Sequence, residues 1–119
     1  MMIVWMAMWV FHTNDVCIYP PIRLDVMHGW VEASDGDRLS GVQVRVYGQG
    51  IDRTEVTDSQ GVYNFGELKP GNYDLEISAL GFQGSHLKVQ VTRWVRKKWC
   101  LGANLYINDC ALLRRVQCE

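Results

Sequence analysis

A cluster of tryptophans and basic residues contains the side chains best suited to recognise another molecule. Trp94 and Trp99 enclose three cations, Arg96, Lys97 and Lys98. Indole rings stack on sugar rings, and the cations attract anionic polymers or lipid headgroups. The cluster therefore predicts a binding site. The ordinary alternative is that the tryptophans cap the end of a protein core while the cations extend into solvent.

Four cysteines offer a second kind of chemistry. Cys17, Cys100, Cys110 and Cys118 include no Cys-x-x-Cys pair. Zinc sites usually combine such closely spaced pairs or add histidines, so the spacing favours disulfides or free thiols. A bond between Cys100 and Cys110 is geometrically possible if they face each other across a hairpin turn near Asn108. Four cysteines allow three complete pairings, and the sequence leaves all of them open.

Catalytic and cofactor-binding patterns are missing from the sequence. His12, His28 and His86 are scattered singly, and there is neither a Gly-x-Ser-x-Gly elbow nor a Gly-x-x-x-x-Gly-Lys phosphate loop. The acidic turns at 35–37 and at Asp58 offer fewer oxygens than the six or more that calcium requires. We therefore expect no catalytic residues, no metal site and no cofactor.

The composition is that of one ordinary globular domain. The 119 residues are 48% hydrophobic and 21% charged, with a net charge of -1, so the chain can bury a core without metal or disulfide links. A near-neutral chain does not favour nucleic acid as a partner. The 11 glycines and the short apolar runs favour an all-β fold over a mixed one.

The N-terminal segment has two interpretations. Residues 1–11 form an apolar run that is long enough for the core of a signal peptide and too short to span a bilayer as a helix. No Lys or Arg precedes the run, and no small-x-small cleavage site follows it. The run is therefore either an atypical export signal or, alternatively, a buried strand or a misassigned start. No membrane span is predicted.

Alternating apolar residues predict the strands that would position these side chains. In 42–47 three valines alternate with bulkier or polar residues, and the same period recurs in 62–65, 73–80 and 86–92. A period of two is typical of strands with one buried face. The residues that we expect to face a shared core are Val42, Val44, Val46, Tyr63, Phe65, Tyr73, Leu75, Ile77, Leu87, Val89, Val91, Leu105 and Ile107.

Seven such strands with turn residues between them predict an all-β fold, a Greek-key-type β-sandwich of two sheets spanning residues 22–108. Residues 1–21 are then an apolar segment with a proline-rich approach to the domain, and residues 109–119 are a C-terminal extension. The extension fits the period of a helix and that of a strand, so both remain open. Gly29 marks a possible bulge in the first strand.

Five residues are expected to shape the turns of this sandwich. Asp58 can accept backbone N–H groups across its turn, and Gly61 supplies a positive φ. Pro70 and Gly71 fit the two central positions of a type II turn, and Gly81 ends a strand where the chain folds back. We interpret all five as structural.

A set of these motifs, taken in order, carries a family resemblance. The segments are 29–31 (GWV), 39–44 (LSGVQV), 57–65 (TDSQGVYNF), 68–73 (LKPGNY) and 79–82 (ALGF). Together they resemble the carboxypeptidase regulatory-like domain over roughly residues 22–92. The resemblance implies a transthyretin-like (prealbumin-like) sandwich, similar to the B-type repeats of collagen-binding adhesins.

The resemblance also shapes the functional expectation. It implies an accessory domain of metallocarboxypeptidases, but the chain lacks the zinc-site pattern of the peptidase itself, and it does not end in the Tyr-Arg-Gly-Ser tail of transthyretin-like hydrolases. We expect a non-catalytic, exported module of the cell envelope or extracellular space that binds a protein or a carbohydrate. The alternatives are a transthyretin-like hydrolase acting as an oligomer, and a fragment detached from a larger metallocarboxypeptidase or outer-membrane receptor. The oligomeric state is left open.

Overall fold

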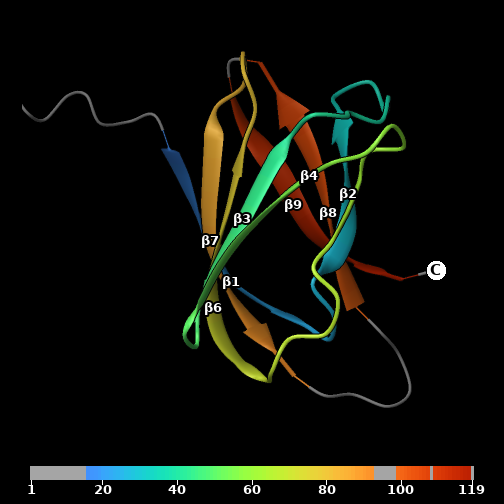
Figure 1. Cartoon of the computed structure of the whole chain (residues 1–119). Coiled ribbons are helices and arrows are strands. Elements are labelled where there is room, and N and C mark those ends of the chain that lie inside the picture. The colour runs from blue at the N-terminus through green and yellow to red at the C-terminus, as the bar shows by residue number, and fades with distance from the viewer. Residues whose placement is uncertain (1–15, 93–98, 108, 119) are drawn as a thin grey trace, which may run out of the picture.

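The computed structural model describes residues 16–92, 99–107 and 109–118, which form nine strands packed as two layers (Figure 1). The first sheet has the order β1 (Val16–Leu24), β7 (Gly84–Val91), β6 (Gly71–Ser78), β3 (Gln43–Gly48) and β4 (Ile51–Val56). The second has the order β5 (Val62–Asn64), β2 (His28–Ala33), β8 (Trp99–Tyr106) and β9 (Asp109–Gln117). No helix long and apolar enough to cross a bilayer occurs in these residues.

The all-β sandwich is confirmed, but it has nine strands where seven were predicted. Both sheets extend past the predicted 22–108 boundaries, because β1 begins at Val16 and β9 occupies 109–117. The prolines at 20 and 21 fall where the pairing of β1 with β7 shifts between Tyr19 and Ile22. Proline is tolerated there because β1 is an edge strand, which needs fewer backbone donors.

Strand direction places the first and last segments side by side. β1 runs parallel to β7 and β2 runs parallel to β8, while the remaining pairs are antiparallel. In the strand order, β1 is at one edge of the first sheet and β9 is at one edge of the second sheet. These two edge strands contact each other. The second pair of edges, β4 and β5, lies in contact at the other side of the sandwich.

The alternation correctly predicted the core. Val44, Tyr63, Tyr73 and Val89 are at most 2% exposed, and they belong to one apolar cluster shared by both sheets. Ile107 is the exception. It is 66% exposed because β8 ends at residue 106, so Ile107 belongs to the turn into β9 rather than to an inward-facing position.

The turn before β5 forms as expected. Asp58 Oδ1 accepts the backbone N–H groups of Gln60 at 2.8 Å and Val62 at 3.0 Å, and Gly61 has a φ of 72°. These two hydrogen bonds lower the pKa of Asp58 below its usual value, because they favour the charged carboxylate.

The predictions for two other turns, at Gly81 and at Pro70 with Gly71, fared differently. The N–H of Phe82 donates to the carbonyl of Ala79 around Gly81, so the chain folds back there as predicted, but Gly81 lies within the turn because β6 already ends at Ser78. The Phe82 ring packs against the core. Gly71 instead begins β6 with a φ of 154°. That angle is far from the roughly +80° of a type II turn, so the turn expected at Pro70 and Gly71 is not of that type.

Gly29 lets β2 and β8 approach each other closely. The bulge predicted at Gly29 does not form, because β2 pairs with β5 and β8 there without a shift in register. A Cβ at this position would overlap the carbonyl oxygen of Leu101 and would lie 2.8 Å from the hydroxyl of Tyr63. That hydroxyl donates to the same carbonyl at 3.2 Å. Burial raises the pKa of Tyr63, so the phenol remains protonated and keeps its hydrogen bond.

Candidate functional site

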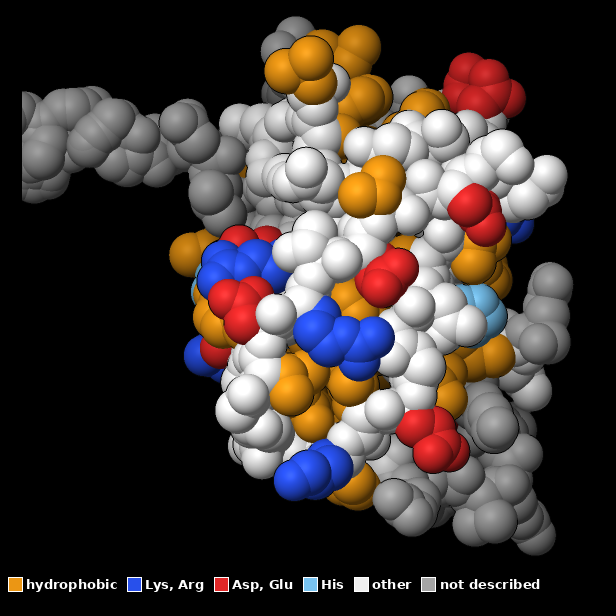
Figure 2. All heavy atoms as spheres, viewed as in Figure 1, with side chains coloured by type: hydrophobic (Ala, Val, Ile, Leu, Met, Phe, Trp, Pro, Cys, Tyr) orange, Lys and Arg blue, Asp and Glu red, His pale blue; other side chains and the backbone are white. Residues whose placement is uncertain are grey.

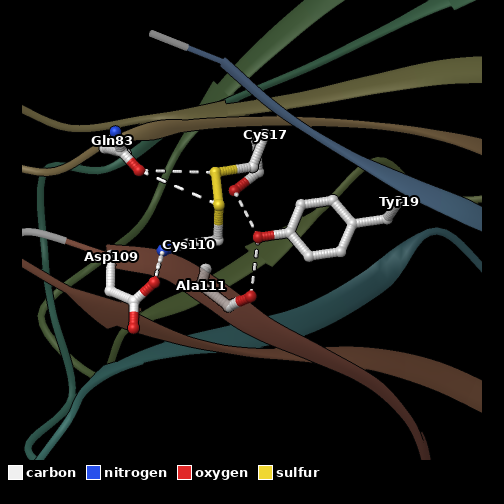
Figure 3. The surroundings of a disulfide bond; sticks show 7 residues. Cys17, Tyr19, Gln83, Asp109, Cys110 and Ala111 are labelled. Carbon is white, nitrogen blue, oxygen red and sulfur yellow. Dashed lines mark hydrogen bonds between the residues drawn. A yellow bond between two sulfur atoms is a disulfide. The ribbon is translucent and has the colours of Figure 1, made fainter. Parts of the chain in front are cut away.

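The contact between edge strands β1 and β9, which we call the seam, is held by a disulfide and a tyrosine (Figure 3). Cys17 of β1 is bonded to Cys110 of β9, with their Cα atoms 5.8 Å apart. The Tyr19 hydroxyl donates to the carbonyl of Ala111 at 2.6 Å, and Gln83 Oε1 lies 3.4 Å from Cys17 Sγ. The seam therefore joins the two sheets covalently and by a hydrogen bond.

A groove of about 380 Å³ opens along the seam. Its residues come only from β1 and β9, and they combine apolar side chains with cations: Tyr19, Pro20, Pro21, Ile22, Arg23, Leu113, Arg114 and Arg115. We call it the seam groove. A smaller hollow of about 100 Å³ shares Arg23 and Arg115 with it and adds Asp25, Thr92 and Trp99. A concave surface with an apolar lining and a few charged groups is the usual form of a binding site.

The charges of the groove are mainly positive. Arg114 donates to Asn104 Oδ1 at 3.0 Å, and the Arg115 guanidinium lies 4.5 Å from the centre of the Trp99 ring. Within the described part of the chain, Arg23, Arg114 and Arg115 make no salt bridge. Because they outnumber the one acid among the described residues that line the two hollows, Asp25, and form no ion pair with it, the three arginines favour an anionic ligand.

The one carboxylate of the smaller hollow is already occupied by its neighbours. Asp25 Oδ2 accepts the backbone N–H of Trp99 at 2.9 Å, and Asp25 Oδ1 accepts the Thr92 hydroxyl at 3.2 Å. These bonds fix the start of β8 relative to the end of β7. The carboxylate thus has a structural role.

The basic cluster predicted from the sequence is only partly described. Trp94, Arg96, Lys97 and Lys98 lie outside the described residues, so their predicted role remains a prediction. Trp99 is described, and its ring is partly buried against the core under Arg115, as expected of a tryptophan that caps a sandwich. Its edge also lines the smaller hollow beside the seam groove.

The bond between Cys100 and Cys110 that the sequence allowed does not form. Cys100 faces Val116 in the β8–β9 register, whereas Cys110 lies at the opposite end of β9, next to the turn. Cys100 is bonded instead to Cys118, one residue after β9, with a Cα–Cα distance of 5.3 Å. Cys110 meets Cys17, which the sequence had placed outside the sandwich.

One group of metal-ligand side chains occurs among the described residues. His28, Cys100 and Cys118 have ligand atoms within 4.8 Å of one another, and His28 Nδ1 lies 3.7 Å from Cys100 Sγ. Sequence reasoning missed this group because 72 residues separate His28 from Cys100. Both sulfurs belong to a disulfide here, so this oxidised form offers no thiolate to a metal.

On the outer face of the first sheet, acidic and basic side chains form ion pairs. Side chains of both charges are also visible on the face drawn in Figure 2. Arg45 pairs with Asp52 at 2.8 Å, and Asp74 accepts from Lys88 at 2.9 Å and from His86 at 3.0 Å. The Lys88 hydrogen bond lowers the pKa of Asp74 most, with a further contribution from His86. These charges are paired, in contrast to the arginines of the seam groove.

The chain has similarities to known proteins both in structure and in sequence family. Among solved structures, the chain is similar to catechol 1,2-dioxygenase from Acinetobacter sp. ADP1 inhibited by bound mercury, with 13% sequence identity and a TM-score of 0.45. The similarity covers 76% of this chain and 57% of that one, so the chain spans little more than half of that enzyme chain. No curated protein sequence matches the chain. The model of the carboxypeptidase regulatory-like domain matches residues 26–94, more than half of the chain, and the protein therefore belongs to the carboxypeptidase regulatory-like domain family.

Proposed function

We propose that the protein is a non-catalytic binding module of the cell envelope or extracellular space. Two disulfides support export, because such bonds persist in oxidising compartments. Membership of an accessory-domain family supports a binding role over catalysis.

The observation that carries the binding proposal is the seam groove, where three arginines surround an apolar lining. A partner protein that presents an extended segment with acidic and apolar side chains fits this groove best. Its carboxylates would meet the arginines, and its apolar side chains would lie against Ile22 and Leu113. A neutral sugar is a poorer fit, because the Arg115 guanidinium already lies over the Trp99 ring.

The binding test uses short fluorescent peptides in which Glu alternates with Leu, titrated with the full chain and followed by polarisation. The double variant Arg23→Ser with Arg115→Ser should weaken binding by at least roughly tenfold, since each charge-assisted hydrogen bond contributes about 1.5–3 kcal/mol. The matched control is Arg53→Ser with Lys69→Ser, which removes the same charge from exposed positions outside the groove. The control should bind as the parent does.

Three outcomes would contradict the binding proposal. Equal losses in both double variants would mean that only net charge matters. Equal binding of peptides with Lys in place of Glu would remove the arginines from recognition. Retention of a neutral glycan with no retention of acidic peptides would favour the carbohydrate partner. For the absence of catalysis, turnover of a hydroxyisourate-type substrate by the purified chain would reverse the conclusion.

A further inference from the structure

Strand register brings three metal-ligand side chains from three segments to one corner of the second sheet. Gly29 of β2 pairs with Leu101 of β8, so the preceding residues on each strand, His28 and Cys100, are neighbours. Cys118 reaches the same corner from the end of β9. The meeting of the three therefore follows from the pairing of β2, β8 and β9 and not from any local motif.

The spacing of these side chains is close to that of a zinc site. Zinc bonds of about 2.3 Å to sulfur and 2.0 Å to nitrogen place tetrahedral ligand atoms about 3.5–3.8 Å apart. His28 Nδ1 and Cys100 Sγ are already 3.7 Å apart, and all three ligand atoms lie within 4.8 Å. The two sulfurs would have to separate from the roughly 2.0 Å of a disulfide bond to about 3.7 Å, a movement of about 1.7 Å that Cys118 would supply. Cys118 lies one residue beyond the last strand, where the chain is least constrained by sheet hydrogen bonds.

We propose that this corner is a redox-gated zinc site. In the oxidised form the sulfurs of Cys100 and Cys118 are bonded to each other and hold no ion. A dithiol reductant transfers two electrons and two protons to this bond, giving two thiols while the reductant becomes a disulfide. Zn²⁺ then displaces the two thiol protons and is bound by both thiolates and His28, with water in the fourth position.

Reduction leaves the elements of this site in place. Cys100 and Cys118 lie in and next to two strands that remain joined by a hydrogen-bonded ladder, with Trp99 opposite Gln117 and Leu101 opposite Arg115. The site would therefore be nearly preformed in the reduced protein, and little chain entropy would be lost on metal binding.

The other disulfide provides a control within the same molecule. The Gln83 amide oxygen lies beside both sulfurs, at 3.4 Å from Cys17 Sγ and 3.8 Å from Cys110 Sγ, and the one group of metal-ligand side chains among the described residues includes neither cysteine. Two thiolates without a third nitrogen or sulfur ligand form a weaker zinc site. Zinc binding by the reduced protein should therefore depend on one cysteine pair only.

The experiment titrates the fully reduced chain with Co²⁺ under anaerobic conditions after the dithiol has been removed, and then displaces Co²⁺ with Zn²⁺. Cobalt reports on its ligands through a thiolate charge-transfer band in the near ultraviolet and through visible bands that are strong in tetrahedral sites. We expect one ion per chain, both signals, and displacement by Zn²⁺. The variant Cys17→Ser with Cys110→Ser should retain them all.

Variants at the site separate the proposal from its alternatives. His28→Ala should weaken Co²⁺ binding by at least the roughly tenfold that loss of even an outer-shell partner causes. Cys100→Ser with Cys118→Ser should abolish the thiolate band. Circular dichroism of the oxidised His28→Ala protein serves as the folding control, and His28→Gln is a second variant if His28→Ala does not fold.

Several results would overturn the proposal. They are a thiolate band unaffected by either His28 variant, equal binding by the chain that retains only Cys17 and Cys110, and one ion shared between two chains. Failure of the reduced chain to fold in the presence of metal would overturn it too. None of these results bears on the seam groove, because the zinc site does not depend on the proposed partner.

Discussion

The two disulfides of this protein perform different tasks although they have the same chemistry. Cys17–Cys110 spans 93 residues and joins edge strands of two different sheets. Cys100–Cys118 spans 18 residues and links neighbouring strands of one sheet that a hydrogen-bonded ladder already joins. The first bond closes one side of the sandwich, and the second adds to a contact that would exist without it.

This difference shows that the value of a crosslink depends on what else holds the same segments together. Loss of Cys17–Cys110 leaves the seam with few contacts beyond the Tyr19 hydrogen bond to Ala111. Loss of Cys100–Cys118 leaves β8 and β9 paired along most of their length. Opening of the second bond therefore leaves the sheet in place, as the proposed zinc site requires.

The largest effect is expected from Cys17→Ala with Cys110→Ala. Closing a 93-residue loop in the unfolded chain is worth about 4.6 kcal/mol in the chain-entropy model, and the variant loses this contribution. The free energy of unfolding should fall by an amount near that figure, measured by urea denaturation without reductant. If the free energy of unfolding fell no more than in the variant that lacks Cys100 and Cys118, the two disulfides would not differ in the way described.

A smaller effect is expected from Cys100→Ala with Cys118→Ala. The same model gives about 3 kcal/mol for an 18-residue loop. The ladder between β8 and β9 should survive, so hydrogen exchange should remain slow for those amides of residues 112–115 in the edge strand β9 that donate to β8. Rapid exchange at these amides would show that the second disulfide holds the sheet together after all.

Tyr19→Phe should produce the next smaller loss, about 1–2 kcal/mol, because the carbonyl of Ala111 loses its donor at the seam. The loss should shrink in the chain that already lacks Cys17 and Cys110, since a looser seam holds the tyrosine less well. A double-mutant cycle from urea denaturation measures this coupling. Strict additivity would mean that the hydroxyl and the disulfide act independently.

The smallest effect is expected from pH. The difference in unfolding free energy between the two cysteine double variants should not change as the pH is lowered. Neither disulfide titrates, so the gap in stability between the two cysteine variants should be the same from neutral pH to about pH 3. Both variants should nevertheless lose stability in acid through Asp74, whose pKa is lowered in the folded state by Lys88 and His86.

The sign of the acid effect follows from that lowered pKa. The carboxylate of Asp74 stabilises the fold above the ordinary aspartate pKa of 3.8, and this contribution disappears as the pH falls through the lower, folded-state pKa. Urea midpoints between pH 7 and 3 should therefore decrease less in Asp74→Asn than in the parent. An equal decrease would assign the acid sensitivity to other carboxylates.

Much of the sandwich was predictable because local signals agree with the fold. The valines at 42, 44 and 46 alternate in a way that only a strand with one buried face explains, and all three are buried. Asp58 and Gly61 were predictable for a similar reason, since the chemistry of that turn lies within a few residues.

The seam was not predictable, because its two strands carry weak or misleading local signals. Pro20 and Pro21 indicate an irregular approach to a domain, yet β1 accommodates them at a shift in register on a sheet edge. The segment 109–117 fits the period of either a helix or a strand. The seam groove therefore depends on two elements that sequence reasoning placed wholly or mostly outside the sandwich, and so does the partner of Cys17.

The pairing of β1 with β7 also constrains how the protein can be made. A strand at residues 16–24 must wait for its neighbour at 84–91, and the second sheet is incomplete until 109–117 has been synthesised. Folding that follows synthesis residue by residue therefore cannot finish this domain before residue 117 has left the ribosome. Such a topology completes its folding slowly, as is usual for domains with distant strand partners.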